Sequence, residues 1–223
     1  MTSLNGRFDQ HPDETEQTMG QIFGAKFDAK WVGDVSAEAA LTYLQAVRMM
    51  LKQDRRRGLA ALHELFRSGD APTQPLHGRY VGELLVLEIA PILTQVMQHI
   101  TQWWMPWLGK QFDAAHACGD TILHRSSLPW VRLLYPFYRH IVPDSTETYR
   151  AFSFRTWLGP GQVDPDVRVL KIDYNLPENP RPTIRRVLDE VVELAESFYL
   201  GKAHLCWWWG RWQMVGYFML RAV

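Results

Sequence analysis

The stretch Leu205-Cys206-Trp207-Trp208-Trp209-Gly210-Arg211-Trp212-Gln213-Met214 places four tryptophans within six residues near the end of the chain. Glycine tolerates the positive φ that the first central residue of a type II′ hairpin turn requires, so we expect Gly210-Arg211 to reverse the chain. Trp209 then faces Trp212, and two antiparallel strands extend from this pair. This hairpin decides the fold that we predict, because its register determines which side chains share a face.

Side chains alternate between the two faces of a strand, so the expected register separates the hairpin into two sets. One face has no polar side chain apart from the indole N–H groups, and it consists of Trp209, Trp212, Trp207, Met214, Leu205, Gly216, Ala203, Phe218, Gly201 and Leu220. The other face is mixed and places His204 opposite Tyr217. Three small residues on the apolar face, Gly201, Ala203 and Gly216, leave room for a close approach to the backbone. That room admits the rest of the protein, a ligand in a lined cavity, or a partner or membrane surface.

The composition limits the classes of function. A chain of 223 residues forms one large domain, or one domain with an appendage. Its formal net charge is zero, which gives no general attraction to nucleic acid or anionic lipid. The ten tryptophans are the unusual feature, since indole suits core walls, ligand pockets and interfaces.

The chain also carries signals of its compartment. Two cysteines, Cys118 and Cys206, are too few for a disulfide framework and read as thiols in a reducing environment. The first residues are acidic and lack an apolar run, unlike a secretory signal. Residues 89–109 have no formal charge, but two prolines and several polar side chains interrupt them, so we predict no integral membrane span. We therefore expect a cytoplasmic protein.

The first part of the chain reads as helical. Residues 1–30 are polar and predicted to be partly disordered. Residues 31–70 are predicted to form a helical hairpin, in which Ser36 caps the first helix and the second ends before Gly69. The arginine run at residues 55–57 lies between the apolar patterns, and it either grips phosphate or forms a solvated corner.

Residues 77–223 are predicted to form an antiparallel, barrel-like domain with helical insertions. Strand-like sequence covers residues 78–89 and 121–124, and residues 149–158 and 167–174 read as a hairpin with turn residues between its strands. Apolar residues at helical spacing predict amphipathic helices at residues 91–110 and 183–197, the second with Asp189 and Glu190 mostly facing outward. Residues 130–142 are apolar but irregular, and their structure is not predicted.

The clearest strand pairs are antiparallel, and no repeated βαβ pattern with glycine-rich turns occurs. We predict an α+β fold: a bent antiparallel sheet or barrel of about six to eight strands, with packed helices and an N-terminal helical hairpin. Residues 77–223 resemble the lipocalin-like (calycin) barrels, which open on a Gly-x-Trp strand and close with a strand whose arginine packs near that tryptophan. Here Gly78-Arg79-Tyr80 has tyrosine in place of tryptophan, and Arg221 ends the last strand. The resemblance implies carriage or sensing of a small apolar molecule.

No catalytic or metal-binding motif stands out. The eight histidines form no HxH or HxxxH array, and His116 and Cys118 make only a two-residue pair, so no metal site or cofactor is predicted. The sequence has no Gly-x-Ser-x-Gly elbow for a nucleophile. Acid–base chemistry by His204, Tyr217 or Asp173 is physically possible, because the expected register brings His204 and Tyr217 together.

These observations predict a binding protein for a small apolar or amphipathic molecule in a tryptophan-lined barrel cavity. Inward-facing arginines are expected to hold an anionic head group, because guanidinium groups pair well with carboxylates. The candidate ligand-binding residues are Trp207, Trp209, Trp212, Phe218, Leu205, Tyr149, Arg155, Trp157, Arg168, His204 and Tyr217. An enzyme that acts on a lipophilic substrate by His/Tyr chemistry and a protein-interaction module are the alternatives. The sequence predicts no nucleic-acid partner and does not indicate an oligomeric state.

Overall fold

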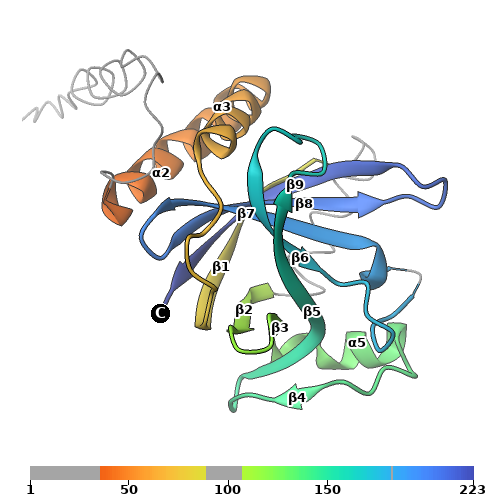
Figure 1. The fold of residues 1–223 in the computed structure, drawn as a ribbon. Coiled ribbons are helices and arrows are strands. Elements are labelled where there is room, and N and C mark those ends of the chain that lie inside the picture. Colours follow the sequence, from red (N-terminus) through yellow and green to blue (C-terminus); the bar gives the residue numbers. More distant parts are fainter. Residues whose placement is uncertain (1–35, 89–106, 182) are drawn as a thin grey trace, which may run out of the picture. The chain divides into compact units, whose positions relative to one another are not determined.

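The computed structural model describes residues 36–88, 107–181 and 183–223, and antiparallel strands dominate them (Figure 1). The strands are β1 (Gly78–Leu87), β2 (Trp107–Asp113), β3 (Cys118–His124), β4 (Val142–Pro143), β5 (Thr148–Pro160), β6 (Arg168–Asp173), β7 (Val187–Ala195), β8 (Phe198–Cys206) and β9 (Trp212–Ala222). Eight of these strands close into a barrel, and the short β4 pairs only with β5.

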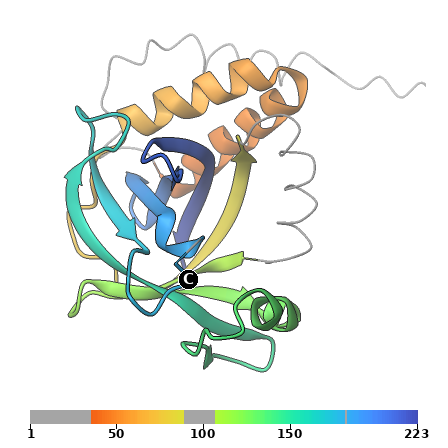
Figure 2. The ribbon, with the colours of Figure 1, turned by 90° about the vertical axis from the view of Figure 1, so that its right-hand side faces the viewer.

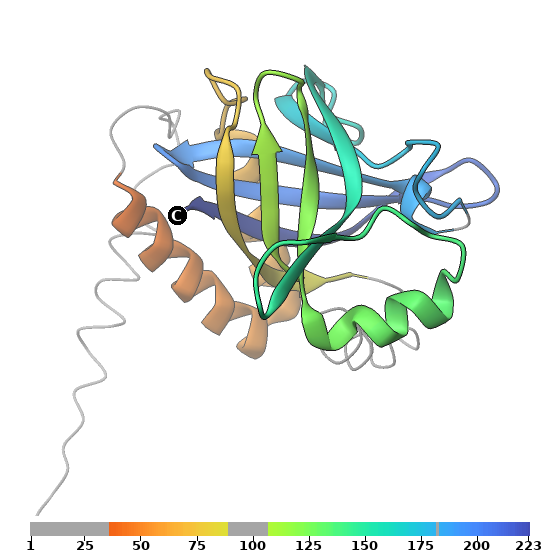
Figure 3. The same cartoon turned by 90° about the horizontal axis from the view of Figure 1, so that it is seen from below.

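The barrel has an up-and-down order. Each long strand pairs with its neighbours along the chain, β3 pairs with β5, and the first strand closes the barrel by pairing with the last. Figure 2 shows the sheet curving round on itself, and Figure 3 shows β1, β2 and β3 side by side. The predicted α+β fold with an antiparallel barrel is therefore confirmed.

The predicted helical pair is also present, as α2 (Ala37–Gln53) and α3 (Arg55–Ser68). The Ser36 side chain accepts a hydrogen bond from the Ala39 amide, as expected of an N-cap. Asp54 separates the helices and caps α3 by accepting from the Arg57 amide, so the three arginines form the first turn of α3 and are exposed. None of the described helices is long and apolar enough to cross a membrane.

Short helical elements occupy two of the connections. The 3₁₀ turn η1 (Arg125–Ser127) leads into α5 (Leu128–Leu134), whose later residues lie in the segment 130–142 for which no structure was predicted. A second turn, η2 (Ile184–Arg186), leads directly into β7.

The helix predicted at residues 183–197 is wrong, because this segment forms η2 and β7. Val187, Val191 and Leu194 match a helical spacing, but they lie on a strand that is buried on both faces. Such a strand shows no alternation of apolar and polar residues. Asp189 and Glu190 are 6% and 0% exposed, so neither is solvated as predicted. Asp189 lines the cavity inside the barrel, and Glu190 pairs with Lys171. The helix predicted at residues 91–110 lies outside the described residues except for residues 107–110, for which the prediction is wrong because they belong to β2.

The tryptophan hairpin reverses at Gly210, whose φ is +80°, but it has a longer loop than predicted. Trp212 pairs with Cys206 instead of Trp209, so residues 207–211 form the loop. A bulge between Ala203 and His204 then shifts the register again. Together the two shifts displace the pairing from the predicted register by an even number of residues. Since side chains alternate between the two faces, the small and apolar residues beyond the bulge still share the face that points into the barrel.

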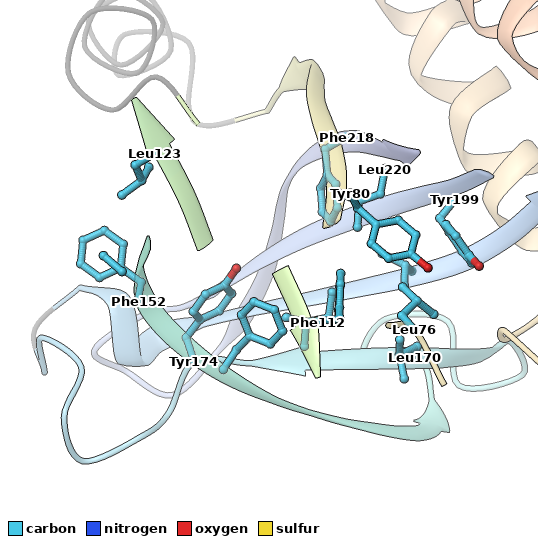
Figure 4. Packing of buried hydrophobic residues seen from close by; sticks show 14 of the residues in the cluster. Leu76, Tyr80, Phe112, Leu123, Phe152, Leu170, Tyr174, Tyr199, Phe218 and Leu220 are labelled. Atoms are coloured by element: carbon cyan, nitrogen blue, oxygen red, sulfur yellow. The ribbon is translucent and has the colours of Figure 1, made fainter. Parts of the chain in front are cut away.

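Aromatic and aliphatic side chains form the buried core of the barrel (Figure 4). Tyr80 packs edge-to-face against Phe112 and Tyr199, with ring centroids 5.2 Å and 5.7 Å away. Arg221 does not take the position near Tyr80 that the lipocalin-like pattern implies, because it pairs with Val81 and its side chain is exposed.

Candidate functional site

A cavity of about 390 Å³ lies inside the barrel, where it is bordered by strands from both halves of the sheet. Nine of the described lining side chains are apolar and four are polar. The apolar ones are Leu84, Leu87, Trp107, Leu123, Phe152, Ile184, Val187, Ala203 and Phe218, and the polar ones are Lys110, Thr121, Tyr174 and Asp189. The cavity is thus an apolar space with a small polar group in its wall.

The four polar side chains form one hydrogen-bonded cluster. The Lys110 ammonium donates to Asp189 Oδ2 at 2.8 Å and to the Tyr174 hydroxyl oxygen. Tyr174 Oη donates to the same carboxylate oxygen at 3.3 Å, and Thr121 Oγ1 lies 3.3 Å from Tyr174 Oη. Lys110, Thr121, Tyr174 and Asp189 come from four different strands or strand ends, so closure of the barrel brings them together.

Aromatic rings surround the Lys110 ammonium. Its nitrogen lies 4.9 to 5.6 Å from the ring centroids of Trp107, Phe154, Tyr174 and Phe218. Burial opposes the charged form of Lys110, but Asp189 and Tyr174 outweigh this effect and raise the pKa of the ammonium. Burial raises the pKa of Tyr174 to about 12, although Lys110 opposes this shift. At neutral pH the site therefore presents an ammonium and a neutral phenol, and not the free amine that a nucleophilic lysine needs.

The cavity accommodates part of the predicted apolar face. Phe218 and Ala203 line it, as the hairpin pattern suggested. The space at two glycines is filled by the barrel itself. A Cβ at Gly201 would lie 2.2 Å from the Phe218 ring, and one at Gly216 would lie 2.7 Å from the Val86 carbonyl oxygen of β1.

A second group of predicted residues lies together on the outer face of the barrel. Trp157, Trp207 and Trp212 line a groove of about 560 Å³ there, and the Arg155 guanidinium lies 5.2 Å from the centroid of the Trp157 ring. Trp209 stacks on Trp207 at 5.1 Å and is 61% exposed. The prediction that Trp207, Trp209 and Trp212 line the barrel interior is therefore wrong. The longer loop carries Trp207 and Trp209 beyond the strand ends, and Trp212 begins β9 and lines the outer groove.

His204 and Tyr217 are not opposite each other. The bulge pairs His204 with Met214 and Tyr217 with Lys202. Both side chains lie on the outer face and are 0% and 1% exposed, and neither lines the cavity. Burial lowers the pKa of His204 despite the nearby Glu190 carboxylate. A His204–Tyr217 acid–base pair has no geometric support.

The remaining predicted residues are dispersed. Tyr149 is buried and its hydroxyl lies 2.8 Å from Ser127 Oγ, whereas Arg168 is exposed at the start of β6. Leu205 is half-buried opposite Gln213. A bulge near Phe152, whose φ is +54°, places Tyr149 and Trp157 on opposite faces of β5.

The sequence reasoning missed Lys110, Thr121, Tyr174 and Asp189 as site residues. Lys110 and Asp189 both lay in segments predicted as helices, residues 91–110 and 183–197. The one available signal was the alternation of Leu108, Lys110 and Phe112 with small or polar neighbours, which is typical of a strand. Within the described residues, no group of three or more His, Cys, Asp or Glu side chains is arranged to hold a metal ion.

Comparison of the chain with protein-family models, with curated proteins and with solved structures finds no match. The geometry of the described residues therefore carries the functional argument.

Proposed function

We propose that the chain binds a small, largely apolar and uncharged molecule in the barrel cavity beside Lys110. The observation that carries this proposal is the contrast between nine apolar lining side chains and one hydrogen-bonded polar cluster. Ligand sites are typically apolar with a few polar groups that orient the ligand, and their volumes run from about 300 to 1,000 Å³. A lipocalin-like role, carriage or sensing of such a molecule, fits the up-and-down barrel.

The charges of the cluster favour an uncharged ligand. The Lys110 ammonium and the Asp189 carboxylate compensate each other at 2.8 Å. A carboxylate ligand would add a negative charge without a second cation, and burial of an uncompensated charge is costly. An ammonium has three N–H donors, of which Tyr174 and Asp189 accept two. An alcohol, ester or ketone oxygen at one end of the ligand is the expected acceptor for the third.

A titration with lauryl alcohol and laurate tests both parts of the proposal. Trp107 lines the cavity, so its fluorescence reports occupancy. We expect saturable binding of the alcohol, with laurate bound about tenfold more weakly. Tighter binding of laurate would refute the charge argument, and no saturable binding of either compound would refute the cavity as a site.

Two variants separate cavity binding from adsorption to the surface. Ala203→Leu adds bulk to the lining, and we expect it to weaken binding of lauryl alcohol by about tenfold or more. Ala115→Leu is the matched control, because Ala115 is exposed in the turn between β2 and β3. If Ala203→Leu fails to fold, Ile184→Trp fills the same cavity from η2. Equal affinities of the cavity variant and the control would contradict the proposal.

A further inference from the structure

The groove on the outer face of the barrel is distinct from the cavity. It extends from Trp157 on β5, across β6, β7 and β8, to Trp212 at the start of β9. Strand β7 separates the two spaces, since Val187 lines the cavity and Leu188 lines the groove. A ligand in the groove therefore contacts different side chains from one inside the barrel.

Indole rings line part of the groove and are held in place by their neighbours. Trp207 Nε1 donates to Gln213 Oε1 at 2.8 Å, and Trp209 stacks against the Trp207 ring with an interplanar angle of 1°. Trp208 lines the groove and remains 73% exposed. Exposed large aromatic groups that cluster and are fixed by hydrogen bonding mark interaction sites.

Arginines also line the groove, and one of them lies against the indoles, since the Arg186 guanidinium is 5.8 Å from the centroid of the Trp208 ring. Arg181, Arg185 and Arg186 line the groove, and none of them has a carboxylate partner among the described residues. Arg185 Nε donates to Asn175 Oδ1 at 3.1 Å, and Arg186 Nη1 donates to the Cys206 carbonyl oxygen at 3.2 Å. These bonds orient two guanidinium groups without neutralising them.

The other charges of the groove compensate one another. Lys171 pairs with Glu190 at 3.1 Å, and Asp173 pairs with Arg155 at 2.8 Å. The three arginines thus leave a local excess of positive charge on a chain whose formal net charge is zero. A local excess of this kind attracts an anion to the groove.

We propose that this groove binds a small anion that carries a planar aromatic ring, the chemistry shared by nucleoside monophosphates and aryl phosphates. Guanidinium groups bind phosphate through paired N–H donors. Indole faces stack on planar rings, and each such contact contributes substantially to affinity. Phosphate alone pairs only with the arginines and a neutral aromatic compound stacks only on the tryptophans, so the ligand that fits contains both parts.

Isothermal titration of the full chain with four probes tests the proposal: adenosine monophosphate, phenyl phosphate, adenosine and inorganic phosphate. We expect adenosine monophosphate or phenyl phosphate to bind about tenfold or more tightly than adenosine and inorganic phosphate. Equal affinities of the two aromatic phosphates indicate that the ring and the phosphate suffice. Tighter binding of adenosine monophosphate indicates that the nucleoside itself is recognised.

Variants test the contributions of the tryptophans and of the arginines separately. Trp208→Ala and Arg185→Gln should each weaken the aromatic phosphate by about tenfold, and Trp208→Phe should retain most of the affinity because it keeps a ring. Arg168→Gln is the control, since Arg168 is exposed but does not line the groove. Thermal melts establish that each variant is folded, and Ala203→Leu should leave this binding unchanged because it alters only the cavity.

Three outcomes overturn the proposal. The first is no binding of either aromatic phosphate at millimolar concentration, including the case in which only a single-stranded oligonucleotide binds. The second is inorganic phosphate that binds as tightly as the aromatic phosphates, which would remove the role of the indoles. The third is an equal loss of affinity in Arg185→Gln and Arg168→Gln, which would reduce the effect to general electrostatics.

Discussion

Two buried lysines, one inside the barrel and one on its outer face, each pair with an aspartate but differ in what surrounds the pair. Lys110 is 1% exposed and pairs with Asp189, and Lys202 is 2% exposed and pairs with Asp164. Both ammonium groups lie over aromatic rings. Lys110 borders the cavity, whereas the Lys202 nitrogen lies 4.2 Å from the ring centroid of Phe66 on α3.

The difference extends to the number of charges in each site. Asp189 has Lys110 as its one cationic partner among the described residues, while Asp164 also receives Arg67 at 3.2 Å and lies 3.8 Å from His63 Nε2. Asp189 and Tyr174 raise the pKa of Lys110 against the opposing effect of burial. On the outer face, burial lowers the pKa of Lys202, and the positive charge of Arg67 lowers it further. The Lys110–Asp189 pair thus provides polar groups in the cavity wall. The outer network, formed by Lys202, Asp164, Arg67 and His63, attaches α3 to the barrel.

The largest effect is expected when the inner lysine is removed. Lys110→Met leaves the Asp189 carboxylate buried without a cation, and loss of one partner from a buried ion pair typically costs about 3–5 kcal/mol. The free energy of unfolding in urea measures this loss. Lys110→Met combined with Asp189→Leu should recover most of it, because an apolar pair of similar volume is often tolerated. A single variant as stable as the unmodified protein would show that Asp189 does not depend on Lys110.

A smaller loss is expected on the outer face. Lys202→Met leaves Asp164 with Arg67 and His63, so we expect destabilisation of about 1–3 kcal/mol, the range for a buried polar group that loses one partner. The same urea titration measures it. If Lys202→Met destabilises the protein as much as Lys110→Met does, the contrast between the isolated inner pair and the shared outer network is wrong.

The same contrast explains which parts of the fold could be predicted from sequence. Helices α2 and α3 carry local signals, such as the Ser36 cap, and the β5–β6 hairpin has turn residues between alternating strands. Strand β7 has no such signal, because both of its faces are buried and Val187, Val191 and Leu194 match a helical spacing. The register of β8 and β9 depends on a bulge at Ala203 and His204, which the residue types do not reveal.

The candidate site could be predicted only in part, for a related reason. Ala203 follows from alternation along β8 and Phe218 from alternation along β9, and alternation within a strand is a local property. The cluster of Lys110 and Asp189 joins residues 79 positions apart, and only closure of the barrel brings them together. Neither residue stands out alone, since a single lysine or aspartate in a strand is ordinarily solvated.

The outer network should also respond to pH. Burial opposes ionisation of Asp164, but Lys202, His63 and Arg67 outweigh it and lower the pKa of the carboxyl group. A lowered folded-state pKa contributes stability that is present above the unfolded value of about 3.9 and is lost as the pH falls through the folded value. The stability difference between the unmodified protein and Asp164→Asn should be constant near neutral pH and should narrow below about pH 4. Urea titrations across this range measure it, and a difference that widens in acid would contradict the assignment.

The smallest single loss of stability is expected when Arg67, the additional charge of the outer network, is removed. Arg67 is partly exposed and also pairs with Asp166, so solvent screens its contribution, and Arg67→Gln alone should shift the urea midpoint less than Lys202→Met does. In the Lys202→Met background the same substitution removes the last fully charged partner of Asp164. The combined loss should therefore exceed the sum of the two single losses, because neighbours in one network do not act independently.

Additive losses would mean that Arg67 does not support Asp164 when Lys202 is absent. The two buried lysines would then differ only in their surroundings and not in the number of charges that they share.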